Sequence, residues 1–112
     1  MPEAGKVAWV MFPYEGAKTD KLHPALVLDV LDDGRCVVAY GSSKHVDSSC
    51  PLPNEVIVSC RSDLAACGLT APTRFDISKR AALVVGKKAM IGALPQHLLK
   101  QLYRAAIHCR LI

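Results

Sequence analysis

This 112-residue sequence is poor in aromatic residues and has no long apolar run. Aromatic residues make up 5% of the chain and Trp9 is the only tryptophan, so we expect a core of Val, Leu, Ile and Ala. No apolar run is long enough to span a bilayer, and the first residues do not form a secretory signal. The sequence therefore predicts one compact domain over residues 1–112, in the cytoplasm and without membrane contact.

The cysteines lack the spacing of a metal site or of a redox pair. They are Cys36, Cys50, Cys60, Cys67 and Cys109, an odd number with no C-x-x-C motif. Zinc binding by Cys50, Cys60 and Cys67 is conceivable, but their spacing matches no familiar zinc knuckle. Cys36, Cys60 and Cys109 fall in apolar stretches, where a reduced thiol behaves as a small hydrophobic side chain. Phosphate-binding and dinucleotide-binding glycine motifs are also absent, so we expect no metal and no cofactor.

Acidic residues are scarce in the second part of the chain. Residues 1–73 contain 6 Lys or Arg and 9 Asp or Glu, whereas residues 74–112 contain 8 and 1. A basic part suits an anionic partner such as nucleic acid, because neutralising phosphates is the general source of affinity for such partners. A solvated basic surface without a ligand is the alternative that charge alone leaves open.

The residues from His23 to Lys44 predict a β-hairpin. Two apolar segments, 25–31 and 36–40, flank Asp32-Asp33-Gly34, which supplies residues that tolerate positive φ. In an antiparallel hairpin the start of one strand lies beside the end of the next. We therefore expect His23 and the step Gly41-Ser42-Ser43 to lie at the same rim of the sheet.

The remaining segments predict a β-rich α+β domain. We expect strands over 7–12, 55–60, 72–77 and 81–85. Ser62 is placed to cap one helical turn over 63–66, which Gly68 would end. A final helix has Pro95 in its first turn and an apolar stripe at helical spacing, formed by Leu98, Leu99, Leu102, Ala105, Ala106 and Cys109. Its other face is basic, with His97, Lys100, Arg104 and His108, and we interpret it as solvated.

The order of several segments is distinctive. Val7-Ala8-Trp9-Val10 precedes Phe12-Pro13, and a loop with Glu15-Gly16 follows. Then come His23-Pro24-Ala25-Leu26-Val27-Leu28 and Val37-Val38-Ala39-Tyr40-Gly41-Ser42-Ser43. This order resembles the start of the MazF/PemK toxins, the endoribonucleases of toxin–antitoxin systems. The resemblance is strongest over residues 6–43, and the terminal helix is similar to the family's last element.

The resemblance implies a small SH3-like or CcdB-like β-barrel with a C-terminal helix, and a homodimer with a cognate antitoxin protein as partner. It also implies metal-independent, sequence-selective cleavage of RNA. Ser42 aligns with the family's catalytic threonine. The family's strand opens with Arg-Pro, whose arginine is its main catalytic residue, whereas this chain has His23-Pro24.

Cleaving RNA without a metal requires proton exchange at the 2′-hydroxyl and at the leaving oxygen, and stabilisation of charge on the phosphorane. We expect His23 to act as base or acid, since an ordinary histidine pKa of about 6.5 makes both forms accessible. Ser42 or Ser43 would donate a hydrogen bond to the scissile phosphate. The residues expected to bind the RNA backbone are Lys18, Lys21, Lys44, Arg74 and Lys79.

Each of these residues also has a plain interpretation. Small hydroxyl side chains beside a glycine are common in turns, and loop lysines are commonly solvated. Arg74 could instead pair with Asp76 or Asp63. A second hypothesis follows: a barrel that has kept the fold, lost the nuclease, and binds a protein or nucleic acid through the same rim. A mobile-element or phage origin fits both hypotheses.

Overall fold

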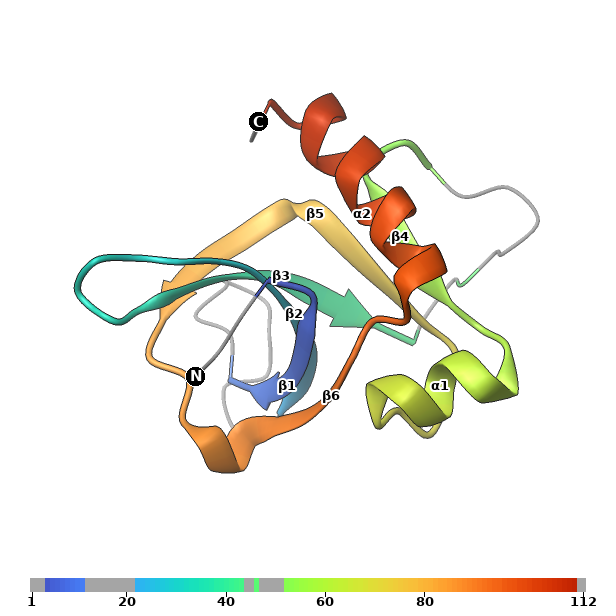
Figure 1. The fold of residues 1–112 in the computed structure, drawn as a ribbon, viewed down its shortest axis with the longest axis horizontal. Helices are drawn as coiled ribbons and strands as arrows, with labels where there is room; N and C mark the ends of the chain where they lie inside the picture. Colours follow the sequence, from blue (N-terminus) through green and yellow to red (C-terminus); the bar gives the residue numbers. More distant parts are fainter. Residues whose placement is uncertain (1–3, 12–21, 44–45, 47–51, 111–112) are drawn as a thin grey trace.

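Six strands, two α-helices and one short 3₁₀ helix make up the part of the chain that the structure describes (Figure 1). This computed structural model describes residues 4–11, 22–43, 46 and 52–110. The strands are β1 Lys6–Val10, β2 His23–Val30, β3 Cys36–Ser42, β4 Glu55–Val58, β5 Thr73–Leu83 and β6 Met90–Ala93. The helices are α1 Arg61–Cys67, η1 Lys87–Ala89 and α2 Gln96–His108.

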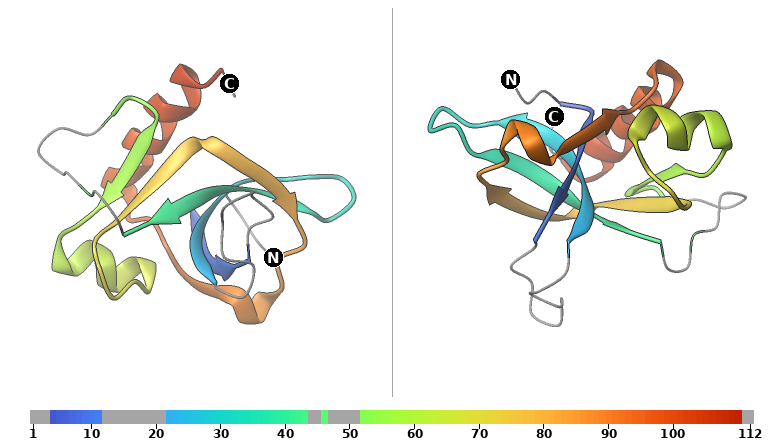
Figure 2. Two further views of the ribbon diagram at one scale, coloured as in Figure 1. Left: turned by 180° about the vertical axis from the view of Figure 1, so that it is seen from behind. Right: turned by 90° about the horizontal axis from the view of Figure 1, so that it is seen from below.

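The strands form one antiparallel sheet in the order β4-β5-β3-β2-β1-β6. Figure 2 shows that this sheet is strongly curved, so that it forms a half-barrel instead of a flat layer. Helix α2 lies beside β4, at the end of the strand order. There the side-chain oxygen of Gln101 accepts a hydrogen bond from the backbone N–H of Ile57 at 3.4 Å. The expected β-rich fold with a C-terminal helix is confirmed.

The predicted hairpin is confirmed as β2 and β3, joined by a turn in which the Gly34 N–H donates to the Leu31 carbonyl at 2.9 Å. Gly34 has a φ of 88°, a conformation that glycine adopts without the clash of a Cβ atom. The strand register shifts between Val27 and Asp29. The chain therefore has one extra residue, Leu28, on the β2 side, which is the pattern of a β-bulge.

Strand β2 is buried on both faces, which explains its continuous apolar sequence. Leu26 packs into one core cluster with Phe75 of β5 and Leu98 of α2. Its neighbours Ala25 and Val27 pack into a second cluster with Val38 of β3. The first cluster lies between the sheet and the helices. The second lies on the other face of the sheet, which curves around it. Aliphatic side chains dominate both clusters, as expected.

Several details of the predicted elements are wrong. Helix α2 begins at Gln96, so Pro95 is its N-cap residue and does not lie in its first turn. The residue that precedes α1 is Cys60, so Ser62 lies inside the helix and does not cap it, while Gly68 ends it as predicted. The two strands expected over 72–77 and 81–85 are one strand, β5. Strand β6 was not predicted, because its four half-buried residues show no polar–apolar alternation.

The cysteines follow the expectation only in part. Cys36 and Cys67 are buried and Cys109 is half-buried, but Cys60 is exposed, because it lies just outside α1 and not within an apolar strand. Cys50 lies outside the described residues. None of the helices in the described part of the chain is long and apolar enough to cross a membrane.

Candidate functional site

The start of β2 and the end of β3 lie beside each other, as the hairpin predicts. The β2–β3 register, continued by two residues, brings His23 opposite Ser42. A Cβ atom at Gly41 would lie 2.5 Å from the carbonyl oxygen of Pro24. The two backbones therefore approach each other so closely that only glycine fits at this position.

Strand β5 adds an arginine to the same row. Ser42 pairs with Arg74, and Arg74 also pairs with Ile57 of β4. Side chains of paired residues, and of residues two apart on one strand, point to the same face of a sheet. Six polar side chains consequently share this face. We call them the polar rim, and they are His23, Tyr40, Ser42, Glu55, Arg74 and Asp76.

The imidazole of His23 is oriented by Tyr40. The Tyr40 hydroxyl lies 3.3 Å from Nδ1 of His23, and the two ring centroids are 5.0 Å apart. Both side chains are half-buried. A contact to one ring nitrogen restricts rotation of the imidazole, and this is how proteins commonly orient a histidine that exchanges protons.

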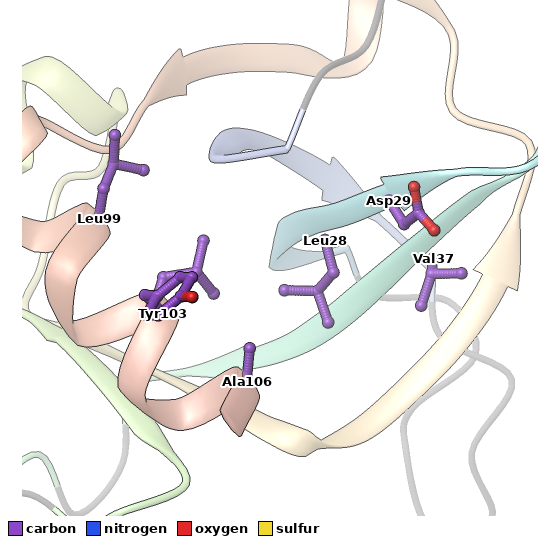
Figure 3. A pocket seen from close by; sticks show the side chains of 7 residues that line it. Leu28, Asp29, Val37, Leu99, Tyr103 and Ala106 are labelled. Carbon is purple, nitrogen blue, oxygen red and sulfur yellow. The ribbon is translucent and has the colours of Figure 1, made fainter. Parts of the chain in front are cut away.

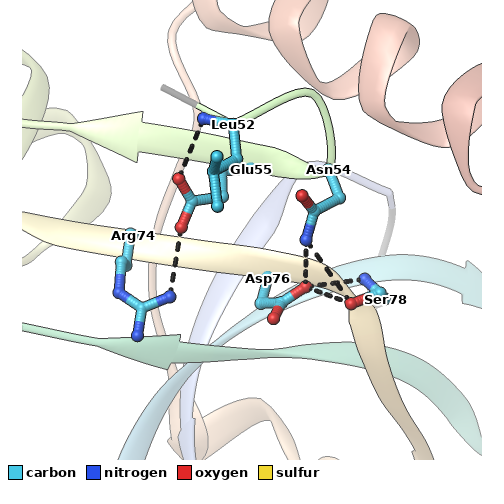
Figure 4. A network of polar contacts seen from close by, with 6 residues as sticks. All are labelled: Leu52, Asn54, Glu55, Arg74, Asp76 and Ser78. Carbon is cyan, nitrogen blue, oxygen red and sulfur yellow. Dashed lines mark hydrogen bonds and ion pairs between the residues drawn. The ribbon is translucent and has the colours of Figure 1, made fainter. Parts of the chain in front are cut away.

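Arg74 is held by a buried carboxylate (Figure 4). Its Nη1 lies 3.1 Å from Oε2 of Glu55, whose other oxygen, Oε1, accepts a hydrogen bond from the Leu52 N–H at 3.0 Å. The side chain of Glu55 is 7% exposed and that of Arg74 is 25% exposed. Pairing of Arg74 with Asp76 or Asp63, which the sequence leaves open, is wrong: within the described part of the chain its carboxylate partner is Glu55.

Asp76 forms a second polar network next to this pair (Figure 4). Its Oδ1 accepts hydrogen bonds from Nδ2 of Asn54 at 2.8 Å, from the Ser78 N–H at 3.0 Å, and from the Ser78 hydroxyl. Burial by itself raises the pKa of Asp76. These hydrogen bonds, together with the charge of Lys79, hold the pKa below its usual range. Asp76 is therefore a charged acceptor that fixes the Asn54 turn against β5.

The other predicted site residues are distributed unevenly. Lys79 lies at the rim, with its ammonium nitrogen 5.9 Å from the centroid of the Tyr40 ring. Ser43 is exposed just beyond the end of β3. Lys18, Lys21 and Lys44 lie outside the described residues. The structure thus brings together His23, Ser42, Arg74 and Lys79 around Tyr40.

Sequence reasoning missed Tyr40, Glu55 and Asp76 as members of the site. Tyr40 was detectable, because a residue two positions before Ser42 on a strand faces the same side. The roles of Glu55 and Asp76 depend on the β4–β5 pairing, in which these two residues lie opposite each other. Nothing in the sequence near β4 indicates which residues of β5 it pairs with.

A second polar cluster joins α1 to α2, away from the polar rim. Nε2 of His97 lies 2.9 Å from Oδ2 of Asp63, and both line a pocket of about 220 Å³ together with Cys60. Hydrogen bonds from His97 and from the Cys60 thiol hold the pKa of Asp63 below its usual range. Burial, helped by the charge of Asp63, raises the pKa of Cys67 to about 11. This cluster connects two helices, whereas the raised pKa of Cys67 comes chiefly from the burial of its thiol.

An apolar groove of about 520 Å³ lies between α2 and the β2–β3 hairpin (Figure 3). Its lining comes from both elements and consists of Leu28, Asp29, Val37, Leu99, Leu102, Tyr103 and Ala106. Tyr103 is 61% exposed and Leu99 is 40% exposed. The predicted basic face of α2 is exposed at all four of its residues, whereas the predicted apolar stripe is buried only in part, because Leu99 is exposed in this groove.

The chemistry available at the polar rim is that of protons and hydrogen bonds. It holds an imidazole, a hydroxyl and a guanidinium in adjacent strands; Nδ1 of the His23 imidazole contacts Tyr40 and its Nε2 is buried. Among the described residues, no group of three or more His, Cys, Asp or Glu side chains is arranged to hold a metal ion.

Comparison with the models of known protein families and with curated proteins finds no match to this chain.

Proposed function

We propose that the chain is a MazF/PemK-like toxin: a metal-independent, sequence-selective endoribonuclease of a toxin–antitoxin system that acts on RNA in the cytoplasm. The observation that carries the proposal is the placement of His23 opposite Ser42, with Arg74 paired to Ser42 on the next strand. In this proposal the half-barrel is of the SH3-like or CcdB-like type. The six antiparallel strands and the C-terminal helix support that assignment.

The proposed reaction uses the rim as follows. The 2′-hydroxyl loses its proton and its oxygen attacks the adjacent phosphorus, while the bond from phosphorus to the 5′-oxygen breaks. The leaving 5′-oxygen gains a proton, and the products are a 2′,3′-cyclic phosphate and a 5′-hydroxyl. His23 exchanges a proton at one of these two oxygens, and Ser42 donates a hydrogen bond to a non-bridging phosphate oxygen.

A cleavage assay in EDTA tests this proposal. The purified chain is incubated with a mixed RNA pool, and the fragment ends are identified by mass spectrometry. We expect cleavage that leaves cyclic phosphate ends, and a rate about 10²–10⁴-fold lower for His23→Ala, the range typical for loss of a proton-transfer group. His108→Ala, which removes an exposed histidine of α2, is the matched control and should cleave at the wild-type rate.

Two results would count against the proposal. RNA left intact by the wild-type chain would contradict the nuclease, and equal cleavage by the wild type and His23→Ala would contradict the role of His23. The second hypothesis, a binding module with the same fold, is favoured by the histidine at the start of β2, because histidine lacks the fixed charge of an arginine. It predicts RNA or protein binding through the rim without cleavage.

The proposal includes two protein partners. One is an acidic antitoxin, and an upstream, overlapping reading frame for a small acidic protein would support it. The other is a second copy of this chain, associated through the apolar groove. Charge favours this second partner: exposed Lys100 and Arg104 lie on α2, whereas exposed Asp29 lies on the hairpin and lines the groove. In a two-fold dimer the basic helix of each copy can face the acidic hairpin of the other.

A further inference from the structure

We infer that Arg74 is the phosphate-binding side chain of the polar rim and that Glu55 is the residue that positions it. This inference rests on the proposed function only in taking RNA as the ligand of the rim. It assigns a role to the carboxylate of Glu55 on β4. Strand β4 pairs with one edge of β5, and strand β3, which carries Ser42, pairs with the other edge.

The position of Arg74 suits this role. It is the direct cross-strand partner of Ser42, so the two Cβ atoms lie about 4.5–5.5 Å apart, as in any antiparallel pair. A phosphate that accepts a hydrogen bond from the Ser42 hydroxyl is then within reach of the guanidinium. Arginine carries a permanent charge and a planar array of five N–H donors, which fits two phosphate oxygens at once.

Glu55 gives the arginine a fixed orientation. Both carboxylate oxygens of Glu55 are bound, one by the Leu52 N–H and the other by Nη1 of Arg74. The carboxylate is buried, so its contact with the guanidinium is screened little by solvent. A guanidinium that is already oriented loses less conformational entropy when it binds a phosphate than a lysine on a mobile segment does.

The hairpin tip provides a matched pair for comparison. There Nε of Arg35 lies 2.7 Å from Oδ2 of Asp33, but the two side chains are 48% and 53% exposed. The tip lies at the opposite end of β2 and β3 from the rim. Arg35 thus has the same charge as Arg74 and is also paired with a carboxylate. Its ion pair, however, is exposed and lies at the other end of the hairpin from Ser42.

The experiment measures binding and cleavage separately. Binding of a fluorescent 2′-O-methyl oligonucleotide, which lacks the attacking hydroxyl, is titrated at several salt concentrations. We expect Arg74→Ala to weaken binding about 10-fold or more at low salt and to reduce the slope of log Kd against log salt by about 1. Arg74→Lys should restore the slope but not the full affinity, and Arg35→Ala should change neither.

Glu55 is tested through its effect on Arg74. We expect Glu55→Gln to weaken binding of the 2′-O-methyl oligonucleotide about 3-fold or more without reducing the salt slope, because Arg74 keeps its charge but loses more conformational entropy on binding. Guanidinium ion added to Arg74→Ala should restore part of the cleavage rate, which a purely structural role would not allow. Circular dichroism checks the fold of each variant. If Arg74→Ala does not fold, the affinity and cleavage rate of Arg74→Lys are compared with those of the wild type instead.

The outcomes separate this inference from the proposed nuclease. Oligonucleotide binding that depends on Arg74, without RNA cleavage by the wild type, supports the inference and contradicts the nuclease. RNA cleavage by the wild type, with Arg74→Ala and Arg74→Lys unchanged in affinity, salt slope and rate, overturns the inference and leaves the nuclease in place. Failure of the wild type to bind the oligonucleotide overturns the inference.

Discussion

Glu55 and Asp63 are two buried carboxylates that each join elements far apart in the sequence. Glu55 connects β4 to Arg74 of β5, and Asp63 connects α1 to His97 of α2. Burying a carboxylate is unfavourable unless hydrogen bonds or an opposite charge compensate for the lost water. Both carboxylates have such partners, so each fixes the relative position of the two elements it joins.

Asp63 should make stability depend on pH in the acid range. Its pKa in the folded state is below the ordinary 3.8, so it stabilises the fold above pH 3.8 and stops doing so as pH falls through its folded pKa. We expect Asp63→Asn to be less stable than the wild type at neutral pH, and to lose less stability on acidification. Urea denaturation at a series of pH values measures this.

Asp32→Asn is the control for that series, because Asp32 is an exposed carboxylate in the hairpin turn. Its stability curve should follow that of the wild type. Parallel curves for Asp63→Asn and the wild type over the whole acid range would show that the contact with His97 does not stabilise the fold.

At the scale of elements, the hairpin was predictable from the sequence and β5 was not. The hairpin is local: a turn with Gly34 between two apolar segments fixes the register, and the register places His23 beside Ser42. In β5 the register against β3 shifts between its pairs Ala39–Arg80 and Tyr40–Asp76, so residues 77–79 bulge. The polar Ser78-Lys79 step looks like a break between two strands, although the chain continues through it.

The pairing of β4 with β5 depends on contacts that the sequence does not encode locally. Glu55 is near Arg74 only because β4 aligns with the first half of β5, which the intervening α1 allows. Sequence patterns therefore found a strand at each of the four places that build the polar rim, and the imidazole, hydroxyl and guanidinium on them, although they divided β5 in two. They did not find the carboxylate that orients the arginine.

The contact between α1 and β6 is unusually close and should not tolerate an added methyl group. A Cβ atom at Gly92 would lie 2.4 Å from the carbonyl carbon of Cys67 and 2.5 Å from the Ala66 carbonyl oxygen. We expect Gly92→Ala to lower the free energy of unfolding by about 1–3 kcal/mol, the usual cost of overpacking. Urea denaturation measures the difference.

Gly86→Ala is the matched control, since a Cβ atom there meets no described atom within 4 Å. It should change the free energy of unfolding by no more than about 0.5 kcal/mol. If both variants were equally stable, β6 would not pack against the end of α1 as closely as the structure shows.

At the scale of the whole molecule, the half-barrel has two distinct surfaces beside its core: the polar rim and the apolar groove. If the groove binds a second copy, the wild-type chain should sediment at twice its mass of 12.1 kDa. We expect Tyr103→Glu to weaken this association by about 2 kcal/mol or more, since buried aromatic residues dominate such interfaces. Analytical ultracentrifugation measures the dissociation constant.

Val84→Glu provides the comparison for that measurement. Val84 is 82% exposed and is not among the residues that line the groove. A Val84→Glu chain should remain dimeric, and a wild-type chain that sediments at 12.1 kDa at all concentrations would contradict the proposed dimer.

The most direct test of the proposed nuclease compares one RNA oligonucleotide with its fully 2′-O-methylated counterpart, both incubated with the wild-type chain in EDTA. The proposed nuclease requires the 2′-oxygen as the attacking atom and the polar rim as the binding site. It predicts that both oligonucleotides bind, and that only the RNA is cleaved, leaving a 2′,3′-cyclic phosphate end. Binding of both with cleavage of neither, or cleavage of both, would contradict it.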